Sequence, residues 1–165
     1  MVQNIRKSGG IGKNSCYQQY PLCACCLEEQ TPCIASGLRF HLFTTYPQTK
    51  VYFKNFKNMD TLEEMQVHPG IQMHGKRVMG ALNHVIENLN NWDVVSSALT
   101  DLAKRHQDVH EVEVNNFQLL FLVILSVFKE ALGAQFTPGH RKSWEKLFSI
   151  TYNFLDSQYT KSDSK

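Results

Sequence analysis

The chain has 165 residues, of which 42% are hydrophobic and 19% are charged, a length and balance that suit one globular domain with a sizeable core. Lysine and arginine number 17 against 15 aspartates and glutamates, and this near balance excludes the strong field of a nucleic-acid-binding or membrane-surface protein. We also expect no stable membrane insertion, because the longest apolar run, from Phe117 to Phe128, is too short for a bilayer.

Residues 1–36 differ in character from the rest of the chain. Glycines and prolines interrupt every helical and strand period there, so we expect a mostly irregular segment. Its basic residues are not followed by an apolar run, which predicts no signal peptide and a cytoplasmic protein. All five cysteines lie in this segment, which argues against a disulfide framework in the remaining domain.

Two interpretations of the cysteines stay open. Cys23 and Cys26 form a CxxC pair with Cys16 and Cys33 on either side, and four thiolates can close a tetrahedral zinc site. Reduced thiols that face solvent are the simpler alternative, because zinc knuckles ordinarily present two such pairs. The nearby run GGIGKNS is not a phosphate loop, since it lacks a glycine and a hydroxyl residue that the motif requires.

From about residue 37 the apolar spacing is helical, and we predict an all-α domain over residues 37–159 with a flexible tail over 160–165. Proline marks three helix starts, because its missing N–H costs nothing in the first turn of a helix. These starts are Pro47, Pro69 and Pro138. Short and long helices alternate, which favours a globular helical fold over an up-and-down bundle.

Two histidines lie on the apolar stripes of separate predicted helices. His74 shares its face with Val78, and His106 shares its face with Leu102. A lone histidine in such a place is ordinarily a partly buried core residue, but two of them suit the two sides of a haem iron. His106 and His110 are also spaced to hold a metal on one helix face, although no third ligand of suitable type lies nearby in the sequence.

Residues 46–53 (YPQTKVYF) and 74–82 (HGKRVMGAL) resemble the vertebrate globins. Phe53 precedes His74 by 21 residues, which is the family's spacing between the phenylalanine that stacks on haem and the distal histidine. The interval of 32 residues from His74 to His106 resembles the cytoglobin branch, with globin Y as another near relative.

The resemblance covers about residues 38–159, and it continues through the helix around Trp144 and Tyr152. It implies an all-α globin fold. The segment 1–36 shows no likeness to the family's first helix, so we expect a globin fold that lacks a recognisable first helix.

The resemblance implies that the chain binds haem b (iron protoporphyrin IX). His106 corresponds to the proximal iron ligand. His74 corresponds to the distal histidine, which in cytoglobin-like globins ligates the iron until a gas displaces it. The other implied haem contacts, on the ring faces and beside the propionates, are Phe53, Arg77, Val78, Leu102, His110 and Val112.

By the same resemblance we expect reversible binding of O₂, NO and CO by a monomer or homodimer. The role would be oxygen storage or transport, or cytoglobin-like NO dioxygenation and reactive-oxygen chemistry with a cellular reductant, and whether the protein is an enzyme stays open. The alternative from another class is a haem-free helical interaction module derived from a globin.

Two departures from the family pattern bear on ligand binding. Arg39 stands at a distal-pocket position that is ordinarily apolar or aromatic, and a charge there is costly unless it reaches solvent or a propionate. Thr31 and Lys76 occupy the positions of cytoglobin's redox-active cysteine pair, so a thiol switch by that route is excluded.

Overall fold

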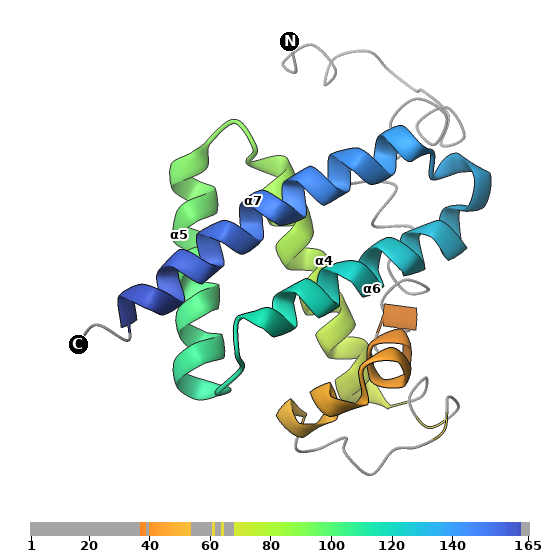
Figure 1. Ribbon diagram of the computed structural model, residues 1–165, viewed down its shortest axis with the longest axis horizontal. Coiled ribbons are helices and arrows are strands. Elements are labelled where there is room, and N and C mark those ends of the chain that lie inside the picture. Colours follow the sequence, from red (N-terminus) through yellow and green to blue (C-terminus); the bar gives the residue numbers. More distant parts are fainter. Residues whose placement is uncertain (1–36, 39, 54–60, 62–63, 65–67, 163–165) are drawn as a thin grey trace.

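The computed structural model describes residues 37–38, 40–53, 61, 64 and 68–162 (Figure 1). In this part of the chain the elements are η2 (Pro47–Tyr52), α4 (Pro69–Glu87), α5 (Trp92–Lys104), η3 (Arg105–Val109), α6 (Asn115–Leu132), η4 (Gly133–Gln135) and α7 (Pro138–Ser162). Residues 40–45, ahead of η2, are helical as well. These described residues contain no strand, so the predicted all-α class is confirmed. The predictions for residues 1–36, including the cysteine sites, and for Arg39 lie outside them.

Helices α6 and α7 follow one another through η4 and contact each other (Figure 1). Helix α5 contacts α7 near the C-terminal end of α7, and η3 continues directly from α5. Helix α4 crosses behind both α6 and α7 in this view. Helices α4 and α5 therefore run across α6 and α7 rather than alongside them, which is typical of a globular helical fold rather than an up-and-down bundle.

Pairs of aromatic rings join α6 to α7. The rings of Phe121 and Phe148 lie parallel with centroids 4.4 Å apart, and the rings of Phe128 and Trp144 are 4.9 Å apart. All four side chains are buried. Each such pair adds about 0.5–1.5 kcal/mol beyond the area that it buries.

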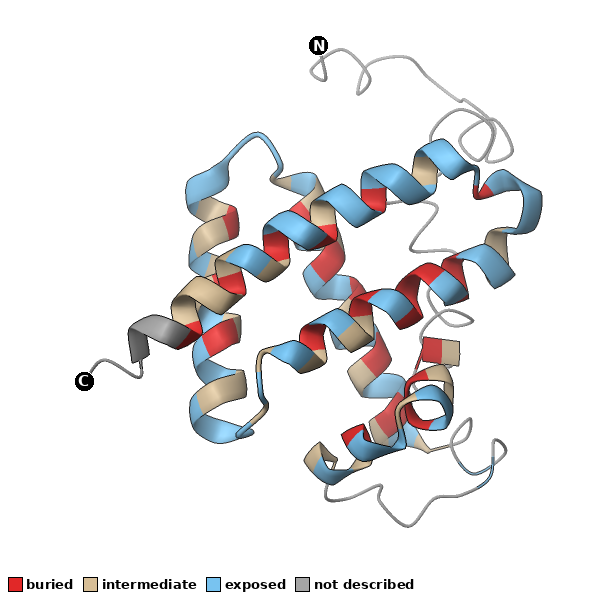
Figure 2. Ribbon diagram, viewed as in Figure 1, coloured by how far each residue is buried: buried red, intermediate tan, exposed pale blue. Residues whose placement is uncertain are grey.

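Helix α6 is the most apolar element, and Figure 2 shows buried residues along it. Within the described residues, one helical segment, Asn115–Gln135, is long and apolar enough to cross a membrane by length and composition alone. Its buried side chains, all in the protein core, are Phe117, Phe121, Val123, Ile124, Leu125, Val127 and Phe128. Packing inside the protein thus accounts for the apolar side chains on one face of this helix, whereas Leu122 on another face is 50% exposed.

Proline begins three elements as predicted. Pro47 starts η2, which is a 3-10 helix, and Pro69 and Pro138 start α4 and α7. The two α-helices also have capped first turns. The His68 imidazole Nδ1 accepts from the backbone N–H of Gly70 at 3.1 Å, and the Thr137 hydroxyl accepts from the N–H of His140 at 3.3 Å.

Two helix boundaries differ from the predicted ones. The apolar spacing of the helix that begins at Pro69 continues as far as Leu89, but α4 ends at Glu87 and the side chain of Leu89 is 55% exposed in the following turn. Helix α7 continues to Ser162, past the predicted end at residue 159. Most residues after Leu155 are polar, so the sequence offers little sign that the helix continues. The buried Tyr159 is the residue that ties this last part of α7 to the core.

Candidate functional site

The imidazole of His106 is half-buried at the end of α5, where η3 begins. Its Nδ1 lies 2.8 Å from the backbone oxygen of Leu102, one helical turn earlier. A carbonyl oxygen can only accept, so Nδ1 carries the ring proton in this bond. The second ring nitrogen, Nε2, is then left with a lone pair, which is the form of histidine that ligates metals.

The surroundings of His106 favour the neutral ring. Burial lowers the pKa of His106 below its usual value of 6.5, although the hydrogen bond to Leu102 acts in the opposite direction. The nearby His110 and Arg105 lower the pKa of His106 further, because a positive charge on the His106 ring would be repelled by theirs. At neutral pH the ring is therefore uncharged and able to donate its lone pair.

A π turn carries His106. The backbone N–H of His110 donates to the oxygen of Arg105 at 3.2 Å, which is the i to i+5 pattern of η3. The N–H of Val112 then donates to the oxygen of His106 at 2.9 Å. Between these bonds, Glu111 has a φ of 52°, in the left-handed region that few residues other than glycine adopt. The backbone after His106 is thus held in an irregular turn.

Two residues that sequence reasoning did not assign to the site contact this turn. The ring of Phe117, on α6, lies 5.0 Å from the ring of His106. The hydroxyl of Tyr159, on α7, donates to the backbone oxygen of Val112 at 3.0 Å. The four-residue spacing from Leu155 to Tyr159 was the available signal for Tyr159, since it continues the apolar stripe of α7.

A second group of predicted site residues lies at the junction of η2 and α4. Phe53 directly follows η2, and its ring meets the ring of His74 edge-on with centroids 5.3 Å apart. The ring of Phe53 also contacts the ring of Phe43, with centroids 5.2 Å apart, and Phe43 is buried. The core therefore supports Phe53, and Phe53 in turn supports His74.

The remaining predicted residues lie on the same elements. Val78, one turn after His74 on α4, and Leu102 on α5 are half-buried and pack against the core. Arg77 and His110 are exposed, and the ring of His110 lies 5.7 Å from that of His106. The structure thus gives contacts among His106, Leu102, His110 and Val112, and separately between Phe53 and His74.

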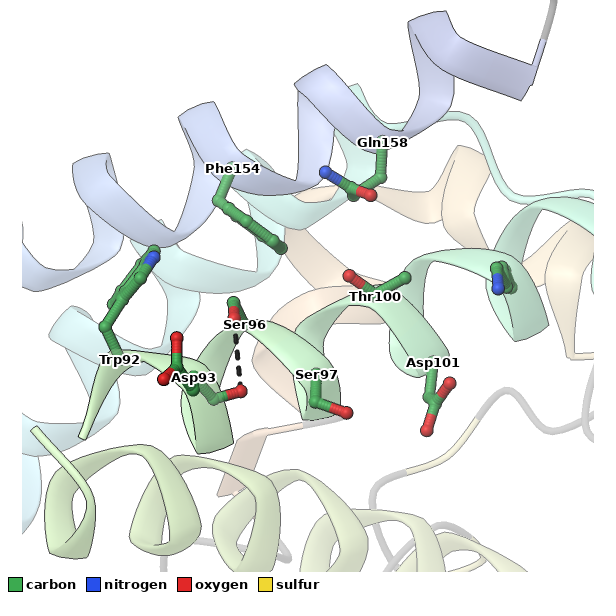
Figure 3. A pocket seen from close by; sticks show the side chains of 9 residues that line it. Trp92, Asp93, Ser96, Ser97, Thr100, Asp101, Phe154 and Gln158 are labelled. Carbon is green, nitrogen blue, oxygen red and sulfur yellow. Dashed lines mark hydrogen bonds between the residues drawn. The ribbon is translucent and has the colours of Figure 1, made fainter.

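In the part of the chain that the structure describes, two surface hollows lie away from these residues. The larger, of about 570 Å³, lies between α5 and α7, where the rings of Trp92 and Phe154 meet edge-on at 5.6 Å (Figure 3). The smaller, of about 490 Å³, adjoins it along Asp93, Ser97 and Asp101. Neither lining includes the two predicted haem ligands, so these hollows are not the site.

A zinc site on His106 and His110 has no support. In the described part of the chain, no three histidine, cysteine, aspartate or glutamate side chains gather where they could hold a metal ion. A single half-buried imidazole with a bare Nε2 instead fits a metal whose other ligands come from a macrocycle.

Comparison with known proteins gives one consistent result. The family described as globin matches residues 38–155. Cytoglobin-2 of Danio rerio is 38% identical over 118 residues, which cover 72% of this chain and 66% of that protein. Cytoglobin-1 of Danio rerio is 35% identical over 76% of this chain and 72% of its own length. Hemoglobin subunit beta-3 of Aquarana catesbeiana is 32% identical over 72% of this chain and 78% of its own length. The chain thus spans about two thirds of the first of these relatives.

Proposed function

The chain belongs to the globin family, and on this premise we propose that it binds haem through His106 and takes up diatomic gases at the haem iron. Its helices form an all-α globin fold. The observation that carries the proposal is the hydrogen bond from His106 Nδ1 to the oxygen of Leu102, which leaves Nε2 bare on a neutral ring. Haem b, when bound, would supply an iron centre that coordinates O₂, NO or CO reversibly.

The residues around His106 would make the proximal side. Leu102 supplies the acceptor that orients the imidazole and an apolar side chain beside it. Val112 holds the turn through its bond to the oxygen of His106. His110 and Arg77 are exposed, and we propose them as the donors to the propionate carboxylates of a bound haem.

His74 would be the distal residue. Phe53 supports its ring, and Val78 adds an apolar side chain one turn further along α4. An imidazole N–H there can donate a hydrogen bond to a bound gas, and the apolar neighbours keep water away from it. We propose that His74 itself ligates the iron when gas is absent, as the cytoglobin likeness implies.

The physiological role we propose is oxygen storage or transport in the cytoplasm, by a monomer or homodimer. NO dioxygenation or peroxidase-like chemistry is the enzymatic alternative, and it requires a cellular reductant that returns the iron to its ferrous state. Rapid re-reduction of the haem by such a donor would favour the enzyme, whereas its absence would favour the carrier.

The test is a haem titration of the purified chain, followed by visible spectroscopy. We expect a Soret band in the unmodified chain and in His84→Ala, because His84 is an exposed histidine on the same helix as His74. His106→Ala should lose the band, and His74→Ala should retain it. A chain that folds but shows no Soret band would instead support the haem-free interaction module, and a band that survives His106→Ala would refute the assigned ligand.

A further inference from the structure

The ring of Phe117 lies directly against the imidazole of His106. The two centroids are 5.0 Å apart and the planes are tilted by 53°. Phe117 is only 6% exposed and belongs to the core through α6. A ring that is fixed by the core therefore limits where the neighbouring imidazole can turn.

The hydrogen bond to Leu102 does not fix the imidazole by itself. It holds one atom, Nδ1, at 2.8 Å from the Leu102 oxygen, and coupled changes in the two side-chain torsions can still tilt the ring while that distance is kept. A second contact, made with another part of the ring, restricts this tilt and so sets the ring plane. Phe117 makes such a contact from another helix.

Other residues hold Phe117 in place on the side away from His106. The ring of Tyr159 meets the ring of Phe117 edge-on at 6.4 Å, and the Tyr159 hydroxyl is bound to the oxygen of Val112. The N–H of Val112 returns to the oxygen of His106. These four residues form a closed circuit of contacts, so Phe117 has little freedom to yield when the imidazole moves.

We propose that Phe117 is a positioning residue, whose ring sets the plane of the His106 imidazole for ligation of the iron. The proposal rests on the proposed function, since the direction of Nε2 matters when it coordinates a metal. A hydrogen bond fixes the tautomer, and an aromatic contact from α6 fixes the plane. Phe117 acts through His106 and needs no contact with the gas.

Three variants separate this role from ordinary core packing. Phe117→Leu keeps an apolar side chain but removes the flat ring, and Phe117→Tyr keeps the flat ring. Phe121→Leu is the matched control, because Phe121 lies one turn further along α6, is also buried, and stacks on Phe148 rather than on His106. All three are made in the full chain.

The first readout is the iron–histidine stretching band in resonance Raman spectra of the ferrous, haem-loaded protein. The measurement is made in the His74→Leu background, where His106 is the one remaining imidazole ligand assigned to the iron. We expect Phe117→Leu to shift and broaden the band, and Phe117→Tyr and Phe121→Leu to leave it in place. An unmoved band in Phe117→Leu, or an equal shift in Phe121→Leu, would overturn the proposal.

The second readout needs no haem, which keeps failure of this proposal distinct from failure of the proposed function. In the haem-free chain, the ring current of Phe117 displaces the NMR signals of the His106 ring protons. We expect that displacement to be lost in Phe117→Leu and kept in Phe117→Tyr and Phe121→Leu. Ring-proton signals that Phe117→Leu leaves unmoved would overturn the proposal even if the chain binds haem.

Discussion

The hydroxyl of Tyr159, near the end of α7, donates a hydrogen bond of 3.0 Å to the backbone oxygen of Val112, in the turn that follows His106. One bond thus ties the last helix to the segment that carries the proposed iron ligand. The side chain of Tyr159 is 8% exposed, so its hydroxyl has little access to water as an alternative partner.

Replacement of Tyr159 by phenylalanine should lower the free energy of unfolding by about 1 kcal/mol. The change removes one hydrogen bond and leaves the Val112 oxygen without its donor, while the ring stays in the core. Chemical denaturation of the two proteins measures the difference. Tyr152→Phe is the control, because Tyr152 donates instead to the exposed side chain of Asn115, and an equal loss in that variant would contradict the prediction.

Alkaline pH should weaken the fold through the same tyrosine. Burial, with the nearby Asp108 and Tyr52, raises the pKa of Tyr159 to about 12, from 10.0. Because the unfolded chain releases this proton first, the stabilisation is complete below pH 10 and is lost as the pH rises toward 12. Denaturation midpoints between these pH values should converge for the unmodified chain and Tyr159→Phe. Curves that stay parallel across this range would show that the pKa is not raised.

His74→Leu should change the ferrous spectrum without loss of haem. The unmodified chain is expected to show a six-coordinate ferrous haem in the absence of gas, because His74 is proposed to occupy the sixth position. Removal of its imidazole should leave a five-coordinate form and faster binding of CO. His84→Leu should behave like the unmodified chain. A five-coordinate ferrous spectrum before any substitution would refute bis-histidine ligation.

Thr137→Ala should destabilise the protein by about 1 kcal/mol, which is the usual cost of losing an N-cap. The Thr137 hydroxyl accepts from the N–H of His140 at the start of α7, and the Thr137 N–H lies 3.2 Å from the His140 Nδ1. Thr137→Ser retains the hydroxyl and should remain close to the unmodified stability in thermal unfolding. If both variants lose stability equally, the methyl group and not the cap is responsible.

Phe128→Ala should cost about 3–5 kcal/mol, because it empties a fully enclosed site. The ring of Phe128 is 1% exposed and contacts Trp144 and Phe136. Leu122 lies on the same helix but is 50% exposed, so Leu122→Ala should stay within about 0.5 kcal/mol of the unmodified protein. Similar losses in the two variants, measured by urea denaturation, would contradict the burial pattern.

Local signals predicted the helices and their starts. Pro69 and Pro138 begin α-helices because the fixed φ angle and the missing N–H of proline suit the first turn of a helix. The spacing of apolar residues from Phe117 to Phe128 matches the buried face of α6. Leu89 shows the limit of such reasoning. Its apolar side chain matched the helical period, but the turn after Glu87 places it in solvent.

The contacts within the site depend on chain segments that lie far apart. The ring of Phe53 meets that of His74 because η2 packs beside the start of α4, which spacing within either element does not specify. Phe117 reads in the sequence as one of many apolar residues of α6, and its contact with His106 follows from how α6 leaves the turn after η3. Tyr159 stands among polar neighbours, so composition concealed a buried side chain.

The π turn of η3 has a consequence for how the sequence around it can vary. A π turn holds one residue more than an α turn, and one residue corresponds to about 100° of rotation around a helix axis. The π turn therefore changes the direction in which the chain leaves toward Val112, relative to the apolar stripe of α5, by about the rotation of one residue. Deletion of a single residue between Arg105 and Val109 would therefore rotate these two segments relative to each other by about 100°.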